Sequence, residues 1–333
     1  MSLKIATSQF AISANIVQNK AHIIAQIQEA KEKACDIIHF PECSLSGYAG
    51  VDFPSFAGFD WDFLDKQLQE ILSFVKTQDI WVILGSSHLS KASSKLFNSL
   101  YVINNKGRIV DRYDKLFCAG DDRLNLGDLA HYTSGNHFTT FSIKGVKCGL
   151  FICHDYRYPE LYRVLKKKDV ALVFHSYHAG NMDTTHQAFM EEQVGEENTA
   201  FNQGKTYPEI TMPATMVSYA ANNYFWISCS NTSAKESCWA SFMVRPDGVK
   251  VGQLTKNKQG ILITEIDTKK AYYDSTELWR ERSMDGIYFS GGDIESYKCL
   301  NCSEIVVTNY CGHCGQKVGR SQFSLKDIFS RKG

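Results

Sequence analysis

Short apolar segments alternate with amphipathic segments along most of the chain. Apolar runs of strand length occupy residues 4–10, 36–40, 80–84, 96–103, 108–113, 138–143, 146–152, 170–174, 224–228 and 261–266. Apolar residues recur at helical spacing over 16–34, 63–75, 159–168 and 212–222. Some neighbouring strands are separated by a short turn only, and others by a whole helix. This mixture of hairpins and βαβ units predicts an α/β fold with mixed β-sheets.

Two segments interrupt this alternation. Residues from about 180 to about 211 are polar and include four glutamates, Glu191, Glu192, Glu196 and Glu197. They indicate an insertion over one end of the sheet. From residue 285 the sequence becomes rich in glycine and serine and then in cysteine. We therefore expect a main domain over 1–284, with the insertion inside it, and a linker with a small tail over 285–333.

The composition narrows the class of protein. A chain of 333 residues can bury a large core without disulfides or metals. Lysine and arginine number 36, as do aspartate and glutamate, and zero net charge argues against a chain that coats nucleic acid or anionic membranes. No apolar run approaches the ~18 residues of a spanning helix, and the first residues lack a signal-peptide layout. These features predict a cytoplasmic protein without nucleic-acid or membrane partners.

The eleven cysteines fall into two groups. Without a signal peptide they are expected to be reduced, so each is a core residue, a nucleophile or a metal ligand. Seven are scattered along the main domain: Cys35, Cys43, Cys118, Cys148, Cys153, Cys229 and Cys238. Four are clustered in the tail: Cys299, Cys302, Cys311 and Cys314.

Three polar motifs follow predicted strands and together indicate chemistry. Glu42 follows the strand 36–40, Lys115 follows 108–113, and Cys153 follows 146–152. Singly, each is typical of a surface or packing residue. A carboxylate in a closed pocket can take the proton of a thiol, and a nearby cation stabilises the oxyanion that forms on attack. Since loops at strand ends gather such groups in α/β folds, we expect one site.

The order of these residues and their flanking sequences resembles the carbon–nitrogen hydrolase, or nitrilase, superfamily, over residues 3 to about 270. The matching segments are Phe40-Pro41-Glu42, Asn98 through Asn105-Lys106-Gly107 to Tyr113-Asp114-Lys115, Cys153-His154-Asp155-Tyr156-Arg157-Tyr158-Pro159-Glu160, Asn222-Asn223 with Asn231, and Pro246-Asp247-Gly248. The resemblance implies a four-layer αββα sandwich and a homodimer or higher homo-oligomer. It also implies acyl transfer without a cofactor, with Glu42 as base, Cys153 as nucleophile, and Lys115 with the backbone N–H of His154 holding the oxyanion.

Several positions depart from the family pattern. The second glutamate of many members is replaced by Asp128, seven residues before Gly135, and we expect Asp128 near Lys115. The histidine that usually follows the lysine closely is absent, because Leu116 and Phe117 stand there. In the segment 218–223 the usual arginine and glutamate are also missing, so the ion pairs of that helix must be replaced by other contacts.

The residues after Cys153 bear on the substrate. True nitrilases usually carry a tryptophan shortly after the cysteine, whereas this chain has Asp155 and Arg157, as amidases and N-carbamoyl amidohydrolases do. The resemblance therefore favours small amides or N-carbamoyl compounds, which would lose ammonia or an amine. We expect Asp155 and Arg157 to brace the turn through an ion pair. Two alternatives remain: a catalytically silent binding scaffold that depends on zinc, and a true nitrilase.

The clustered cysteines predict a structural zinc site. Cys299 and Cys302 form one CxxC pair, and Cys311 and Cys314 form a second after eight residues, which is zinc-ribbon spacing. His313 lies inside the second pair and is interpreted as a non-ligand. Four thiolates close the coordination shell of zinc, so a zinc hydrolase that uses the tail is disfavoured.

Overall fold

The computed structural model describes residues 2–181, 183–290, 297–298, 302–306 and 313. The chain forms two compact units, Met1–Asp274 and Ser275–Gly333. The boundary between them assigns residues 275–284 to the tail unit. In that unit the structure describes helix α6 (Arg280–Met284) and a pair of short antiparallel strands, β15 (Tyr297–Lys298) and β16 (Ile305–Val306).

Two six-stranded mixed sheets form the first unit. The first sheet has the order β14 (Gly260–Asp267), β1 (Ser2–Gln9), β2 (Ile37–His39), β3 (Trp81–Leu89), β4 (Leu96–Ile103) and β5 (Ile109–Asp114). The second has the order β13 (Lys250–Gln253), β12 (Phe242–Val244), β11 (Trp226–Ser230), β10 (Leu172–Ser176), β9 (Val146–Ile152) and β8 (Thr140–Ile143). The three central strands of each sheet run parallel, and the others pair antiparallel. A small ribbon, β6 (Gly120–Asp121) and β7 (Leu126–Gly127), lies beyond β5.

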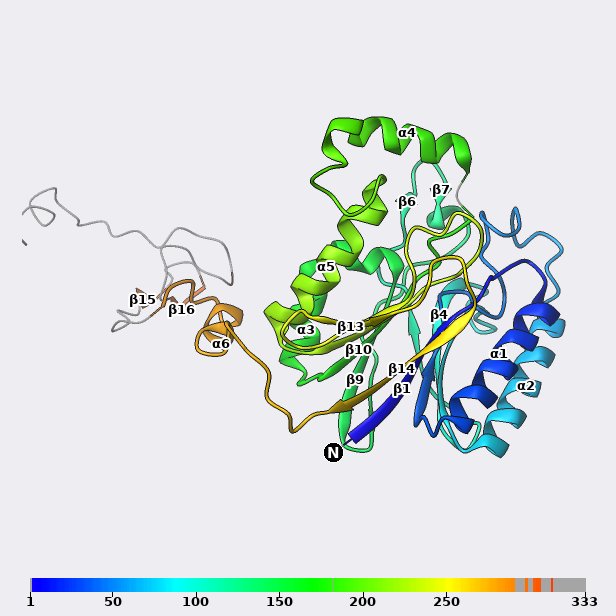
Figure 1. The fold of residues 1–333 in the computed structure, drawn as a ribbon, viewed down its shortest axis with the longest axis horizontal. Helices are drawn as coiled ribbons and strands as arrows, with labels where there is room; N and C mark the ends of the chain where they lie inside the picture. Colours follow the sequence, from blue (N-terminus) through cyan, green and yellow to red (C-terminus); the bar gives the residue numbers. More distant parts are fainter. Residues whose placement is uncertain (1, 182, 291–296, 299–301, 307–312, 314–333) are drawn as a thin grey trace, which may run out of the picture. The chain divides into compact units, whose positions relative to one another are not determined.

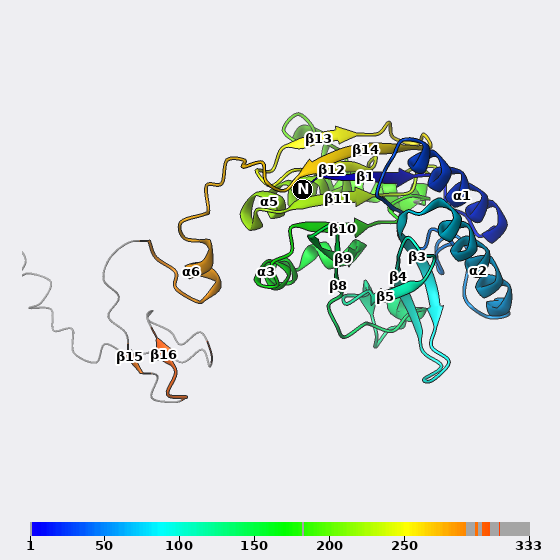
Figure 2. The same ribbon diagram turned by 90° about the horizontal axis from the view of Figure 1, so that it is seen from below.

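Helices cover the outer face of each sheet, which gives an αββα sandwich (Figures 1 and 2). The helices are α1 (Ile16–Glu32) and α2 (Trp61–Gln78) on the first sheet and α3 (Pro159–Lys167) and α5 (Tyr207–Asn223) on the second. Helices α1 and α2 each begin with a polar N-cap residue. Asn15 accepts a hydrogen bond from the N–H of Gln18, and Asp60 accepts one from the N–H of Phe63. These bonds satisfy backbone N–H groups that have no partner within the helix.

Apolar side chains fill the spaces between these layers. Between the sheets, Ile5 and Leu100 of the first lie in one cluster with Leu150 and Phe174 of the second, and all four are fully buried. A separate cluster lies between the first sheet and its two helices. The predicted four-layer sandwich is therefore the observed one, and the two sheets face each other through an apolar interface.

Two boundaries differ from the sequence-based expectation. Strand β3 continues to Leu89, beyond the predicted end at residue 84, because Ser86 and Ser87 are small enough to be buried in the pairing with β4. The insertion over about 180–211 is partly helical, and α5 begins earlier than the predicted residue 212. It contains helix α4 (Thr184–Val194) and the first turn of α5, where Thr206 caps the N-terminus and a proline occupies the first turn.

Candidate active site

Glu42, Lys115 and Cys153 converge at one end of the two sheets. Glu42 follows β2 and Lys115 follows β5 of the first sheet, and Cys153 follows β9 of the second. The Glu42 Oε1 and Lys115 Nζ atoms are 2.9 Å apart, and each side chain is only 1% exposed. The Cys153 thiol lies close enough to Glu42 and Lys115 for the charges of both to act on it. The structure therefore brings the three predicted residues together, with Glu42 and Lys115 buried and Cys153 partly exposed.

Two glycines let the backbone around this group pack closely. A Cβ at Gly85 of β3 would lie 2.1 Å from the carbonyl oxygen of Pro41, directly before Glu42. A Cβ at Gly135 would lie 2.3 Å from the carbonyl oxygen of Asp114, directly before Lys115. Because the obstacle is backbone in both cases, any larger residue would displace one of the two charged side chains.

Lys115 is the centre of a buried charge network. Its Nζ atom lies 2.7 Å from Asp128 Oδ2 as well as 2.9 Å from Glu42 Oε1. Asn98 Nδ2 donates to the same Glu42 oxygen at 2.7 Å, and the Tyr48 hydroxyl donates to Asp128 Oδ1. Burial by itself lowers the pKa of Lys115, but the two carboxylates outweigh it and hold that pKa well above its usual value. Lys115 is therefore a permanent cation.

The surroundings favour the neutral form of the Cys153 thiol, whereas they favour the charged form of Lys115. Burial, and then the charge of Glu42, raise the pKa of Cys153 well above its usual value, against the opposing effect of Lys115. Cys153 therefore rests as a neutral thiol and needs a base at the moment of attack. Glu42 is positioned for that task because its Oε2 atom is buried and has no hydrogen-bond partner among the described residues, while Oε1 is held by Lys115 and Asn98.

The turn that carries Cys153 is strained and braced. Cys153 has a φ of +39°, a conformation that costs a non-glycine residue about 1–3 kcal/mol and is typical of functional sites. The Asp155 carboxylate accepts hydrogen bonds from the N–H groups of Ile152 and Phe117, both at 2.9 Å, and from the Tyr113 hydroxyl at 2.8 Å. These bonds tie the turn to the loop after Lys115.

A buried histidine supports the same turn from the second sheet. His175 Nε2 lies 3.2 Å from the carbonyl oxygen of Cys153, and its Nδ1 lies 2.7 Å from the Tyr162 hydroxyl. Burial lowers the pKa of His175 well below its usual value, so the ring is neutral and Nε2–H donates to Cys153. Here the hydrogen bonds fix the tautomer.

The predicted ion pair between Asp155 and Arg157 is wrong. Among the described residues Asp155 bonds to the three groups named above, whereas the Arg157 guanidinium lies 4.6 Å from the centre of the Tyr156 ring. Nearby positions in this tight turn aim the two side chains in different directions. The missing arginine of α5 is replaced by Tyr219, whose hydroxyl donates to the carbonyl oxygen of Tyr156 at 3.1 Å.

The placement of Asp128 beside Lys115 agrees with expectation, and its role is open to test. Asp128→Asn keeps the shape but removes one of the two charges that hold Lys115. We expect kcat/KM for a substrate amide to fall about 10- to 100-fold, since a hydrogen bond to a charged group is worth about 1.5–3 kcal/mol. Steady-state kinetics measure this loss, and unchanged kinetics would reject a functional role for Asp128.

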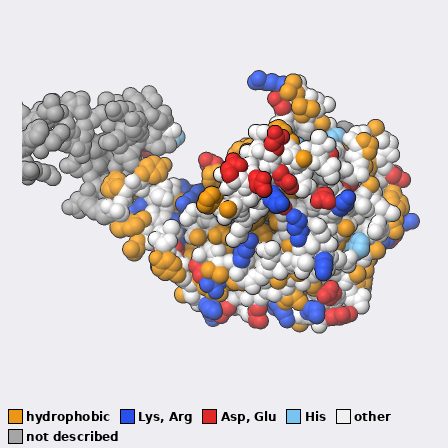
Figure 3. All heavy atoms as spheres, turned by 45° about the horizontal axis from the view of Figure 1, so that its top comes forward, with side chains coloured by type: hydrophobic (Ala, Val, Ile, Leu, Met, Phe, Trp, Pro, Cys, Tyr) orange, Lys and Arg blue, Asp and Glu red, His pale blue; other side chains and the backbone are white. Residues whose placement is uncertain are grey.

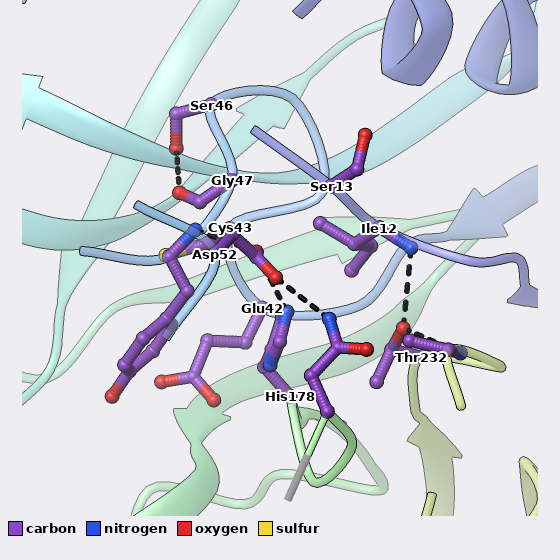
Figure 4. Close-up of polar contacts among 12 residues, drawn as sticks. Ile12, Ser13, Glu42, Cys43, Ser46, Gly47, Asp52, His178 and Thr232 are labelled. Carbon is purple, nitrogen blue, oxygen red and sulfur yellow. Dashed lines mark hydrogen bonds and ion pairs between the residues drawn. The ribbon is translucent and has the colours of Figure 1, made fainter. Parts of the chain in front are cut away.

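The sequence analysis missed two further buried groups beside this cluster. The two groups are the side chains of Asp52 and His178. Asp52 lies on the loop that follows Glu42 and contains Tyr48, and its Oδ2 atom is 3.0 Å from Nε2 of His178. Figure 4 shows this pair next to the Glu42 side chain. A lone histidine and a loop aspartate carry no motif, so no sequence signal identified them. His154, predicted to supply a backbone donor, directly follows Cys153 in the turn, and that role stays a prediction.

The predicted zinc site is not tested by the structure. Of its four cysteines only Cys302 is described, and Cys299, Cys311 and Cys314 lie outside the described residues. Within the part of the chain that is described, no three histidine, cysteine or carboxylate side chains cluster as a metal ion would require. The zinc ribbon therefore stays a prediction.

Comparison with known proteins places this site in a family. The family model "Carbon-nitrogen hydrolase" matches residues 4–273. "Nitrilase homolog 2" of Dictyostelium discoideum is 28% identical over 168 residues, which are 49% of this chain and 50% of that protein. Human "Omega-amidase NIT2" is 25% identical over 175 residues, which are 52% of this chain and 62% of that protein. The chain thus spans about half to three fifths of the length of these curated relatives.

Solved structures share the fold. An amidase from Nesterenkonia sp. superposes with a TM-score of 0.64 at 18% identity, covering 85% of this chain and 95% of the amidase. Another structure of an amidase from Nesterenkonia sp. AN1 (TM-score 0.61, 18% identity, 79% of this chain and 90% of the amidase) has the acetamide moiety of fluoroacetamide covalently added at the active-site cysteine. With the family model covering most of its length, this chain belongs to the carbon–nitrogen hydrolase family, the nitrilase superfamily.

Proposed function

We propose that this protein is a thiol amidase that hydrolyses a small amide or N-carbamoyl compound through a thioester on Cys153. The observation that carries the proposal is a neutral thiol beside a buried carboxylate that is itself held by a buried cation. The names of the relatives, omega-amidases among them, and the covalently modified cysteine of the Nesterenkonia amidase support it.

The geometry supports the first half of the reaction as follows. Glu42 Oε2 takes the thiol proton as Cys153 Sγ attacks the carbonyl carbon. The carbonyl oxygen becomes an oxyanion, which Lys115 and the backbone N–H of His154 stabilise. Collapse of this intermediate breaks the C–N bond, and Glu42 returns its proton to the leaving nitrogen. Proton transfer of this kind contributes about 10²–10⁴-fold and one oxyanion donor about 10²–10³-fold.

The second half repeats the same steps with water. Glu42, again ionised, takes a proton from a water molecule that attacks the thioester carbonyl. The oxyanion forms between the same donors, and its collapse breaks the C–S bond and releases the acid. Glu42 then returns its proton to the sulfur and restores the thiol. No cofactor takes part in either half. Asp128 keeps Lys115 charged even while Glu42 carries the proton, so Lys115 stabilises the oxyanion without exchanging a proton.

The proposal is tested by offering a panel of small amides, N-carbamoyl amines and nitriles to the purified protein. Release of ammonia or amine, together with a mass increase on Cys153 equal to the acyl group, is the expected result for amides or carbamoyl compounds. Turnover of nitriles only would favour the true nitrilase. Absence of both turnover and adduct across the panel would favour the silent scaffold.

The proposal also covers the compartment, the partners and the assembly of the protein. The seven cysteines of the first unit form no disulfide, which supports a reducing, cytoplasmic compartment. Acidic and basic side chains are interspersed on the face of the first unit seen in Figure 3, which supports small-molecule rather than nucleic-acid partners. No helix in the described ranges is long and apolar enough to cross a membrane. A homo-oligomer remains part of the proposal.

The tail is proposed to bind one structural zinc ion through Cys299, Cys302, Cys311 and Cys314. About 35 residues cannot form a stable core alone, and zinc supplies about 10–16 kcal/mol of folding free energy in small zinc-finger peptides. Metal analysis of protein purified under reducing conditions should give one zinc per chain. A chelator should unfold the tail and leave amidase activity nearly unchanged. Well under one zinc per chain would contradict the site.

A further inference from the structure

Two buried polar atoms without a partner lie in the same wall of the site. They are Oε2 of Glu42 and Nδ1 of His178. An unpaired buried polar atom is unfavourable, so such atoms indicate where a ligand completes the hydrogen bonding. Glu42 Oε2 is assigned above to the thiol and the leaving nitrogen. His178 Nδ1 has no role in that mechanism.

The surroundings of His178 fix its orientation. Its side chain is fully buried, and Nε2 lies 3.0 Å from Oδ2 of Asp52, which is 1% exposed. Asp52 is fixed in turn by the N–H of Tyr48 at 2.9 Å and by Asn181 Nδ2 at 2.8 Å. These contacts hold a carboxylate behind the ring, as in sites where an aspartate orients a histidine.

The His178 ring is also linked to the proposed catalytic group through Tyr48. The rings of Tyr48 and His178 are 5.2 Å apart, and the Tyr48 hydroxyl contacts both Asp128 and Lys115. Figure 4 shows the His178 ring beside Glu42 with Asp52 at its far end. A substrate group beside Glu42 would therefore lie near the His178 ring.

The charge of the ring is set by its neighbours. Burial lowers the pKa of His178, but the hydrogen bond and charge of Asp52, with the charge of Glu42, outweigh it and raise that pKa above its usual value. The groups that face the ring are Asp52, Glu42 and Tyr48, all from the loop after β2. In the imidazolium form Nε2–H donates to Asp52, and Nδ1–H is left as a donor for a ligand.

Resting on the amidase activity proposed above, we propose that His178 is a specificity-determining residue that donates a hydrogen bond from Nδ1 to a second acceptor group of the substrate, a carboxylate or carbonyl oxygen outside the scissile amide. The substrate class is then a small bifunctional amide rather than a simple aliphatic one. The acceptor can lie on the acyl side, as in the monoamide of a dicarboxylic acid, or on the amine side, as in an N-carbamoyl amino acid.

The test compares His178→Phe with the wild type on matched substrates. Each acceptor-bearing compound is paired with the unsubstituted amide or carbamoyl amine of equal length. We expect kcat/KM for the acceptor-bearing compound to fall about 10- to 100-fold, and that of its partner to change less than about threefold. The control His88→Phe removes a histidine bonded to Tyr101 outside the site and should leave both values unchanged. An equal loss on both members of each pair, or no loss on either, overturns the proposal.

A binding measurement keeps the proposal testable without turnover. In a Cys153→Ala background, calorimetry should show the acceptor-bearing amide binding more tightly than its partner, with that preference lost in His178→Phe. The preference for a carboxylate should decline as pH rises through the raised pKa of His178, because the ring then loses its Nδ1 proton. The double variant Asp52→Asn/His178→Phe, which leaves no unpaired carboxylate behind the ring, should show the same loss. A preference that survives in both variants refutes the role of His178. Turnover without any such preference in the wild type overturns this inference alone and leaves the amidase standing.

Discussion

Cys153→Ser should abolish amide hydrolysis while the protein stays folded. The substitution replaces one sulfur with one oxygen, so the braced turn keeps its hydrogen bond to Asp155 and the one from His175. A hydroxyl is far less ionisable than a thiol, and burial beside Glu42 already raises the pKa of the sulfur. We expect kcat to fall at least about 10⁴-fold, the scale seen when a nucleophile is removed from an enzyme. Ammonia release measures activity, and the thermal midpoint should shift by only a few degrees.

The matched control is Cys35→Ser, which changes another buried thiol, shortly before strand β2. Burial raises the pKa of Cys35 to about 11, yet none of the three residues of the proposed catalytic group is among the charges that act on it. This variant should retain nearly full activity. Residual activity of Cys153→Ser close to that of the control would show that another group is the nucleophile, and an adduct on a different cysteine would identify it.

The catalytic group could be predicted from the sequence because each of its residues lies in a motif at the end of a strand. Glu42, Lys115 and Cys153 each follow an apolar strand, and parallel strands bring their carboxyl ends to one edge of a sheet. The layers were predictable for a related reason, since apolar periodicity is set by which face of an element is buried. Strand β3 was underestimated because buried serines break that periodicity.

Contacts between distant, unpatterned residues could not be predicted. Asp52 and His178 are 126 positions apart, and neither stands in an apolar or catalytic pattern. Asp155 shows the opposite error: its neighbour Arg157 suggested an ion pair, but the buried carboxylate bonds instead to Tyr113, 42 positions away. Sequence spacing gives proximity along an element, whereas side-chain direction and burial, which decide the partner, depend on the assembled sheets.

Lys115→Met should both inactivate the protein and destabilise it. The side chain of methionine is apolar and of similar length, so the change leaves the carboxylates of Glu42 and Asp128 buried, side by side and without their cation. Breaking a buried ion pair from one side costs about 3–5 kcal/mol. For a unit of this size that corresponds to a fall of roughly 6–20 °C in the melting temperature. Calorimetry measures the fall, and activity should be lost with the oxyanion donor.

The double variant Lys115→Met/Asp128→Asn separates the two effects of that loss. Replacing the Asp128 carboxylate with a neutral amide should recover much of the melting temperature, because it relieves the repulsion between Asp128 and Glu42. It should recover none of the activity, because no cation is restored. The penalty of the single variant should also shrink as pH falls, since uncompensated buried carboxylates bind protons more readily in the folded protein and stabilise it at low pH. In the wild type Asp128 behaves oppositely: burial raises its pKa, but Lys115 and the hydrogen bonds outweigh this and lower it, so its stabilising effect is lost in acid. A single variant that melts like the wild type at neutral pH would contradict a buried, charged network around Lys115.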